Sequence, residues 1–131
     1  MAKETSAPTV AARLSRRLIL FCAKSDLSNA IAGALPSGWE VTHARRITDV
    51  GGFQDVLLHR MVLLDLDEHE AFDPVETVRE IRSGLMLNIP VFCLGGDSAT
   101  RDAARLARAD RFFERSEIEA LVPRLCGQFD W

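Results

Sequence analysis

Apolar residues occur along the chain in two alternating patterns: short continuous runs, and stripes with a spacing of three and four. Continuous runs are typical of strands covered on both faces, and stripes are typical of helices with one buried face. The runs predict three central strands, RLILFCA (17–23), MVLLDL (61–66) and IPVFCLG (89–95). Two shorter, mixed segments predict strands nearer the sheet edges, EVTHARR (40–46) and DRFFER (110–115).

Helix patterns fill the segments between these strands. After the first strand, Ser25 or Asp26 is predicted to cap a helix that ends at the Pro-Ser-Gly turn of residues 36–38. Residues 48–59 predict a second helix, although two consecutive glycines weaken its first turn. Pro74 suits the first turn of a third helix, because its fixed φ is helical and its missing N–H has no partner there.

Two further helices are predicted in the last third of the chain. Asp97 or Ser98 caps the fourth, whose inward-facing stripe includes Leu106. Ser116, three residues before Glu119, has the pattern of a capping box at the start of the fifth. Inside that helix a proline, residue 123, removes a backbone donor and is predicted to kink or shorten the element.

Strands that alternate with helices predict an α/β domain with one parallel sheet. A parallel connection needs a crossover, crossovers are right-handed, and helices therefore cover both faces of the sheet. At 131 residues the chain is long enough for one substantial core and too short for two ordinary domains. We expect a flexible tail over residues 1–14 and a single domain over 15–131.

The composition of the chain argues against a membrane protein, a nucleic-acid-binding protein and a protein held together by disulfides or zinc. No apolar stretch approaches the roughly 20 residues of a membrane span, and no secretory leader precedes the first strand, so we expect a cytoplasmic protein without membrane contact. The net charge of −3 gives no long-range attraction for nucleic acid, and direct nucleic-acid binding is not expected. The three cysteines are widely spaced, which argues against a disulfide framework and a zinc site.

The candidate chemistry lies at the carboxyl ends of the predicted strands. Open parallel sheets gather their ligands and catalytic groups at that edge, near the topological switch point. Asp65 ends the apolar run VLLD there and precedes an acidic loop that begins with Asp67 and Glu68. A buried strand thus brings one carboxylate into a cluster of others, which is costly unless the carboxylate is used or paired.

With these segments in place, the chain resembles the receiver domain of two-component response regulators, which takes a phosphoryl group from a histidine kinase onto an aspartate. The resemblance runs from Arg17 to about Gly127, and the V-L-L-D-L strand is its most specific part. It implies a flavodoxin-like three-layer sandwich with five parallel strands in the order 2-1-3-4-5 and five helices. It also places Asp65 at the phosphoacceptor position.

The rest of the active site departs from the family pattern. Receiver domains have two adjacent acidic residues at the end of the first strand, where this chain has Cys22 and Ala23. They have Ser or Thr after the fourth strand, where Gly95 stands here. Their lysine after the fifth strand matches Glu114, or Arg115 if the match shifts by one residue. The resemblance therefore implies a degenerate pseudo-receiver.

These departures remove the chemistry that phosphorylation needs. Phosphoryl transfer is catalysed by positioning and by neutralising charge on the transferred group, largely through a metal ion. Only Asp65 and Asp67 remain as weak Mg²⁺ ligands, and Glu114 is expected to add negative charge where a phosphate needs a cation. We expect an inactive phosphoacceptor position, no cofactor, and a signalling protein that is not an enzyme.

Two alternatives stay open from the residues. In the first, Asp65 accepts phosphate, and so catalyses its own phosphorylation, through a rearranged Mg²⁺ site with Lys24 or Arg115 as the cation. The oxygens for that site would come from nearby loops, namely from Asp26, Asp67, Glu68 or Asp97. In the second, Gly95-Gly96-Asp97-Ser98 binds an anion or a nucleotide on free backbone amides, although this stretch matches neither common phosphate-binding motif.

The resemblance also nominates an interaction surface. Receiver domains commonly signal through the face formed by the fourth helix, the fifth strand and the fifth helix. The expected partners are signalling proteins, such as a histidine kinase or another regulator, or a second copy of this chain. The residues nominated on this face are Arg101, Arg105, Arg108, Arg111, Phe112 and Glu117.

Overall fold

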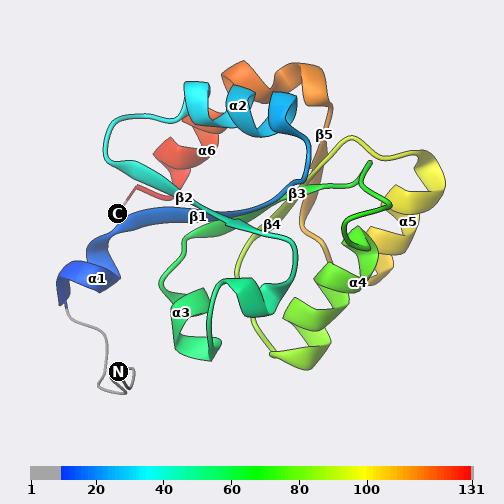
Figure 1. The fold of residues 1–131 in the computed structure, drawn as a ribbon, viewed down its shortest axis with the longest axis horizontal. Helices are drawn as coiled ribbons and strands as arrows, with labels where there is room; N and C mark the ends of the chain where they lie inside the picture. Colours follow the sequence, from blue (N-terminus) through cyan, green and yellow to red (C-terminus); the bar gives the residue numbers. More distant parts are fainter. Residues whose placement is uncertain (1–9, 131) are drawn as a thin grey trace.

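The computed structural model describes residues 10–130, which form a five-stranded parallel sheet between two layers of helices (Figure 1). The strand order is β2-β1-β3-β4-β5, as predicted. Each neighbouring pair is parallel, so all the carboxyl ends of the strands lie along one edge. The strands are β1 (Arg16–Phe21), β2 (Trp39–Ala44), β3 (Met61–Asp65), β4 (Val91–Leu94) and β5 (Arg111–Phe113).

The helices divide between the two faces of the sheet. Figure 1 shows α2 and α6 together over one face, and α3, α4 and α5 over the other. None of the helices in the described part of the chain is both long and apolar enough to cross a membrane. The α-helices are α1 (Val10–Leu14), α2 (Ser25–Ala34), α3 (Phe53–Leu57), α4 (Pro74–Arg79), α5 (Ser98–Leu106) and α6 (Ile118–Gln128). Shorter helical turns are η1 (Ile47–Asp49), η2 (Glu80–Gly84), which prolongs α4, and η3 (Arg115–Glu117).

Alternate residues of each central strand enter two separate cores. Successive side chains of a strand point to opposite faces, so a strand covered on both sides is apolar throughout. In β1, Leu18 and Leu20 pack under α2 and α6, whereas Ile19 and Phe21 pack against the other helices. The continuous apolar runs in the sequence therefore reflect helices on both faces, which is why they predicted central strands correctly.

Helix starts were predicted less accurately than strands. Helix α2 begins at Ser25 with Lys24 at its N-cap position, and the Lys24 side chain makes no capping hydrogen bond, so the predicted N-cap at Ser25 or Asp26 is wrong. The predicted helix over residues 48–59 is interrupted, because Gly51 has a φ of 126°, which separates η1 from α3. The predicted starts at Pro74 and at Asp97 are correct, and Asp97 accepts a hydrogen bond from Thr100 N at 2.7 Å.

The last helix begins earlier than its sequence pattern indicates. Its first turn is η3, and the backbone N–H of Glu114 donates to the Glu117 carboxylate at 2.8 Å. The capping box predicted for Ser116 and Glu119 is therefore wrong by two residues. Pro123 lies inside α6, which nevertheless extends to Gln128.

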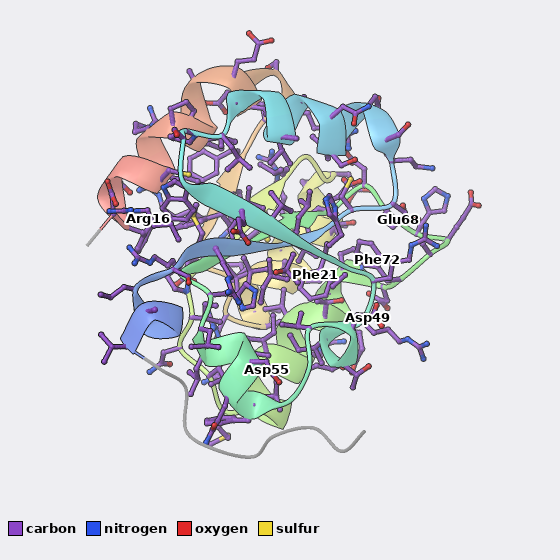
Figure 2. The ribbon with its side chains drawn as sticks, turned by 60° about the vertical axis from the view of Figure 1, so that its left-hand side comes forward. Arg16, Phe21, Asp49, Asp55, Glu68 and Phe72 are labelled. Carbon is purple, nitrogen blue, oxygen red and sulfur yellow. The ribbon has the colours of Figure 1, made fainter. Side chains whose placement is uncertain are left out.

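One buried arginine joins the two ends of the domain. Arg60 donates to the carbonyl oxygens of Leu14, Ser15 and Phe129 at 2.8, 3.2 and 2.7 Å. Arg16, which is labelled in Figure 2, forms an ion pair with Asp130. Within the predicted tail, residues 10–14 are the helix α1, and residues 1–9 lie outside the described residues.

Candidate functional site

Asp65 ends β3 with its side chain fully buried. Its Oδ1 accepts hydrogen bonds from the backbone N–H of Asp67 at 3.0 Å and from Arg115 Nη1 at 2.9 Å. Cys22 Sγ lies 3.9 Å from Oδ2, at the position where receiver domains have a carboxylate. Burial raises the pKa of Asp65 above its ordinary value, even though Arg115 and the Asp67 amide both lower it.

Arg115 is the cation of this site. Its Nη1 lies 2.9 Å from Asp65 Oδ1 and 3.4 Å from Asp67 Oδ2, so one guanidinium bridges two carboxylates. Glu114 points elsewhere: its Oε1 lies 3.0 Å from Arg101 Nη2, and its side chain is 65% exposed. The expectation that Glu114 adds negative charge beside Asp65 is therefore wrong. Arg115 takes the place of the lysine of receiver domains, as the alternative match with a one-residue shift predicted.

Gly95 leaves no room for the hydroxyl residue of the family pattern. Its φ is 75°, which disfavours residues with a Cβ, and a Cβ built there would lie 2.2 Å from Asp67 Oδ2. The carboxylate of Asp67 fills this space and accepts the backbone N–H of Gly96 at 2.9 Å. A carboxylate pairs with Arg115 here, at the place where receiver domains have Ser or Thr.

The same contacts bear on the predicted anion or nucleotide site over residues 95–98. The Gly95 N–H donates to the carbonyl of Phe113 at 2.9 Å, and the Gly96 N–H donates to Asp67. Asp97 caps α5, so a carboxylate occupies the helix terminus. Both glycine amides are thus already bonded, which removes the geometric basis of that hypothesis.

The residues present do not fit the Mg²⁺ ion that the receiver fold implies. The positions of the acidic pair hold a thiol and a methyl group, and Asp65 Oδ1 already binds Arg115. Within residues 10–130, no group of three or more His, Cys, Asp or Glu residues is placed to hold a metal ion. The substitute oxygens considered above serve their own loops: Asp26 accepts from Leu27 N, Glu68 from the amides of residues 69–71, and Asp97 from Thr100 N.

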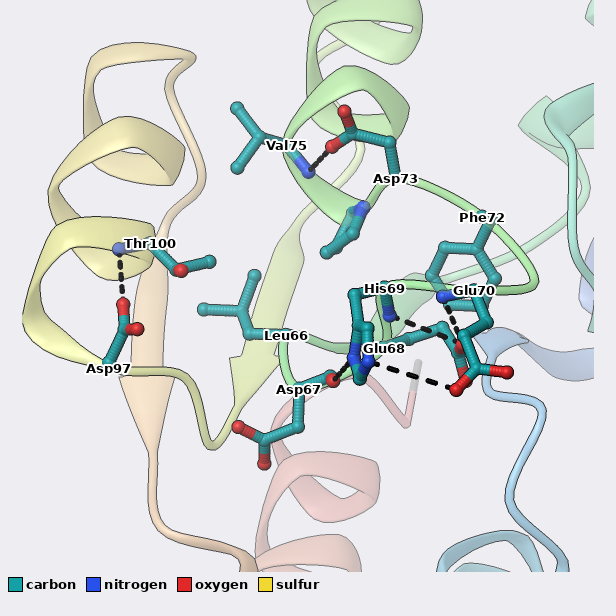
Figure 3. A pocket seen from close by; sticks show the side chains of 11 residues that line it. Leu66, Asp67, Glu68, His69, Glu70, Phe72, Asp73, Val75, Asp97 and Thr100 are labelled. Carbon is teal, nitrogen blue, oxygen red and sulfur yellow. Dashed lines mark hydrogen bonds and ion pairs between the residues drawn. The ribbon is translucent and has the colours of Figure 1, made fainter.

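An acidic hollow of about 680 Å³ lies beside Asp67, between the loop after β3 and the starts of α4 and α5 (Figure 3). Phe72 anchors this loop by an edge-to-face contact with Phe21 in the core, with ring centroids 6.2 Å apart (Figure 2). The hollow is lined by Leu66, Asp67, Glu68, His69, Glu70, Phe72, Asp73, Pro74, Val75, Asp97 and Thr100. The sequence indicated only an acidic loop after Asp65 and did not predict this concavity, because α4 and α5 meet there only in the folded chain.

Some residues of the nominated interaction face lie on the open surface, and others are held by contacts within the domain. The exposed Arg105 lies over the ring of Phe112 at 4.7 Å, and the exposed Arg111 lies over the ring of Phe113 at 5.5 Å. Phe113 itself is buried in the core under α2 and α6. Arg101 instead turns toward the site and donates to Gly95 O. Leu106 was predicted to face inward but is 87% exposed, which makes it the most exposed large apolar residue of the described chain.

Glu117 and Arg108, the other two residues nominated for this face, form hydrogen bonds that involve the backbone. The carboxylate of Glu117 caps η3, and Arg108, at a φ of 79°, offers its carbonyl to the buried Arg82 at 2.9 Å. The available face therefore centres on Arg105, Leu106 and Phe112.

Comparison with known proteins gives structural relatives but no sequence relatives. No family model matches the chain, and no curated protein matches it. The phosphorylated cyanobacterial phytochrome response regulator RcpA is 17% identical over 87% of this chain and 93% of that chain, with a TM-score of 0.68. A response-regulator receiver domain from Bermanella marisrubri is 22% identical over 88% and 98%, with a TM-score of 0.69. The Mn²⁺-bound response regulator Rcp1 is 16% identical over 81% and 91%, with a TM-score of 0.63.

The chain therefore has the fold of response-regulator receiver domains, as the resemblance implied. The match covers 91–98% of each of these chains, so the similarity extends over nearly the whole fold of each.

Proposed function

We propose that this chain is a receiver-like signalling module that acts by binding other proteins and does not rely on Mg²⁺-dependent phosphorylation of Asp65. The fold supports a signalling receiver role. The absence of phosphorylation and the mode of output rest on the residues at the site and on the exposed face.

The ion pair between Arg115 and Asp65 carries this proposal. Phosphorylation requires a carboxylate oxygen that is free to attack and a metal that neutralises the incoming phosphoryl group. Here Oδ1 of Asp65 is bonded to Arg115 and to a backbone amide, and Cys22 offers a thiol in place of a carboxylate. A guanidinium stays charged across the physiological pH range, so Arg115 offsets the charge of Asp65 without supplying the metal ion that phosphoryl transfer uses.

The output surface in this proposal is the face formed by α5, β5 and α6. The exposed Leu106 lies next to Arg105, whose guanidinium covers the ring of Phe112. Arginine and aromatic residues, including Phe, are enriched at the cores of protein interfaces. A partner protein or a second copy of this chain would cover this patch.

The direct test is incubation with acetyl phosphate and Mg²⁺, followed by intact-mass analysis. We expect no phosphoryl adduct on the wild-type chain, while a phosphorylatable receiver domain treated in parallel acquires one. A base-labile adduct that maps to Asp65 and disappears in Asp65→Asn would overturn the proposal. It would instead establish Asp65 as a phosphoacceptor with a rearranged metal site.

The role of the output face has its own test. Leu106→Glu and Arg105→Glu would be compared with Glu40→Lys, a charge reversal at an exposed position on β2, at the opposite edge of the sheet from β5. If the face mediates self-association, sedimentation equilibrium shows a wild-type dimer that the first two variants weaken at least tenfold. A face variant that leaves both self-association and capture of a receiver-binding partner unchanged argues against this surface.

A further inference from the structure

One buried arginine joins two surface turns at the amino ends of β4 and β5. Arg82 is 7% exposed, and its Nη1 donates to the carbonyl oxygens of Leu87 and Ile89 at 2.8 Å each. Its Nε donates to the carbonyl oxygen of Arg108 at 2.9 Å, and its Nη2 lies 2.7 Å from Asp110 Oδ2. The turn after η2 and the turn after α5 are therefore held side by side.

These two turns contain both non-glycine residues of the described chain that have a positive φ. Met86 follows the end of η2 with a φ of 56°, and Arg108 follows the end of α5 with a φ of 79°. A left-handed residue directly after a helix is most commonly glycine, because a Cβ is strained in that conformation. Glycine would suit the backbone better at both positions, so the fold itself does not account for a methionine and an arginine there. Residues held in such strained conformations are enriched at functional sites.

The side chains at and beside these turns are open to solvent. Leu106, the last residue of α5, is 87% exposed and Met86 is 79% exposed, which makes them the two most exposed large apolar residues of the described chain. Arg108 is exposed as well. Single apolar residues on a surface are ordinary, but these two belong to neighbouring segments that one buried arginine holds together. Contact with apolar side chains of a partner would remove both from water.

The charged residues around the turns leave an excess of positive charge. The aspartate in the turn after α5 pairs with the buried Arg82, and Arg105 pairs with Asp102 at 2.9 Å. Within residues 10–130, no carboxylate forms an ion pair with the exposed Arg108 or Arg111. The chain as a whole has a net charge of −3, so this positive charge is a local feature. We call the surface formed by Met86, Leu106, Arg108 and Arg111 the two-turn surface.

An acidic segment with apolar side chains matches this surface better than other occupants do. Arginine donates several N–H groups to carboxylate oxygens, and methionine adapts its shape to apolar partners. A second copy bound through the same surface by two-fold symmetry would bring the unpaired arginines of both copies together, and like charges oppose such a contact. A nucleic-acid backbone would match the arginines but would leave Met86 and Leu106 without an apolar partner.

We propose that the two-turn surface binds an acidic, amphipathic segment of a partner protein, with its carboxylates on the arginines and its apolar side chains on Met86 and Leu106. This inference rests on the proposed function as a protein-binding module, and it names the chemistry of the partner. It extends the proposed output face from the end of α5 to the turn after η2.

The probe is a blocked peptide, acetyl-Glu-Glu-Leu-Phe-Glu-Glu-Leu-amide, titrated into the ¹⁵N-labelled full chain and followed by amide chemical shifts. One control peptide has glutamine in place of every glutamate, and a second has serine in place of every leucine and phenylalanine. We expect the acidic amphipathic peptide to shift the amides of residues 85–87 and 106–112, with an affinity that weakens as salt is added. Each control peptide should bind about fivefold more weakly, or less tightly still.

Substitution by glycine removes each side chain without opposing the backbone. Arg108→Gly and Met86→Gly should each weaken binding of the acidic peptide about threefold or more. Their thermal midpoints should stay close to that of the wild type, because glycine adopts a positive φ without strain. Arg46→Gln, at an exposed position directly after the opposite edge strand β2, is the control and should leave peptide binding unchanged. A purely structural role for these side chains predicts the reverse, a lower thermal midpoint with unchanged binding.

Several outcomes would overturn the inference. These are equal binding of the glutamine peptide, amide shifts confined to other surfaces, unchanged binding by both glycine variants, or tighter binding of a DNA duplex than of the acidic peptide at the same amides. A wild-type dimer that Leu106→Glu disrupts would also overturn it, while leaving the proposed function intact. Conversely, a phosphoryl adduct on Asp65 would overturn the proposed function without bearing on the peptide titration, so the two failures are distinguishable.

Discussion

Arg115 Nη1 lies 2.9 Å from Oδ1 of the fully buried Asp65, across 50 positions of sequence. The pair joins the carboxyl end of β3 to the first turn after β5. Because an internal cation offsets the charge of Asp65, the acidic residue can stay buried at a site that departs from the receiver pattern. Substitution of either residue should therefore change the stability of the domain measurably.

Removal of Arg115 should destabilise the domain. Arg115→Ala leaves the Asp65 carboxylate buried without its cation, and breaking a fully buried pair costs roughly 3–5 kcal/mol. Since the Arg115 side chain is 33% exposed, water can replace part of the interaction, and we expect a loss of about 2 kcal/mol in the free energy of unfolding. Urea denaturation at pH 7 measures it. The control, Arg124→Ala at an exposed position of α6, should stay within about 0.5 kcal/mol of wild type.

Replacement of Asp65 by asparagine should change the pH dependence of stability. Burial raises the pKa of Asp65, so the folded protein binds this proton at a pH where the unfolded chain has released it. The wild type therefore loses stability as pH rises through the window between about 4, the ordinary value of an aspartate, and the raised value. Asp65→Asn has no such loss. Its stability relative to wild type should rise with pH across that window, and a flat difference between pH 4 and 8 would contradict the prediction.

Restoration of the family hydroxyl at Gly95 should fail. Gly95→Ser places a Cβ 2.2 Å from Asp67 Oδ2 at a φ of 75°, so both a clash and backbone strain oppose it. We expect a loss of about 2 kcal/mol by thermal or urea unfolding. Gly33→Ala is the matched control, because its Cβ meets nothing within 4 Å on α2, and it should stabilise the chain by up to about 1 kcal/mol. A fully stable Gly95→Ser variant would show that the loop can rearrange.

The pKa of His59 should lie below the ordinary value of histidine, because burial disfavours the charged ring. Its ring nitrogens lie 2.7 Å from Thr42 Oγ1 and 2.8 Å from Asp55 O, and burial lowers its pKa below 6.5. The unfolded chain therefore gains this proton first as pH falls, and the folded state loses stability below about pH 6.5. Titration of the ring C–H resonances by NMR should give a midpoint below 6.5 for His59. A midpoint at or above that value would exclude the effect.

Secondary structure was predictable where a single local cause decides it. The start of α5 at Asp97 follows from a side chain that caps a nearby amide, and the central strands follow from two-sided burial. Helix starts that depend on the path of the preceding chain were not predictable in this way. The cap at Ser25 and the capping box at Ser116 both had suitable residues, yet the backbone entered each helix at a different position.

The amino-acid sequence by itself determined the parallel α/β sheet, the place of Asp65 at the end of a buried strand, and the departures at Cys22, Ala23 and Gly95. These features depend on residue type and on short-range periodicity. Only the tertiary structure decided that Arg115, and not Glu114, faces Asp65, because that choice depends on β5 ending at Phe113 and on the direction of the turn that follows. The acidic hollow was decided in the same way, since its walls come from segments about 30 residues apart that meet only when two helices pack on the same face of the sheet.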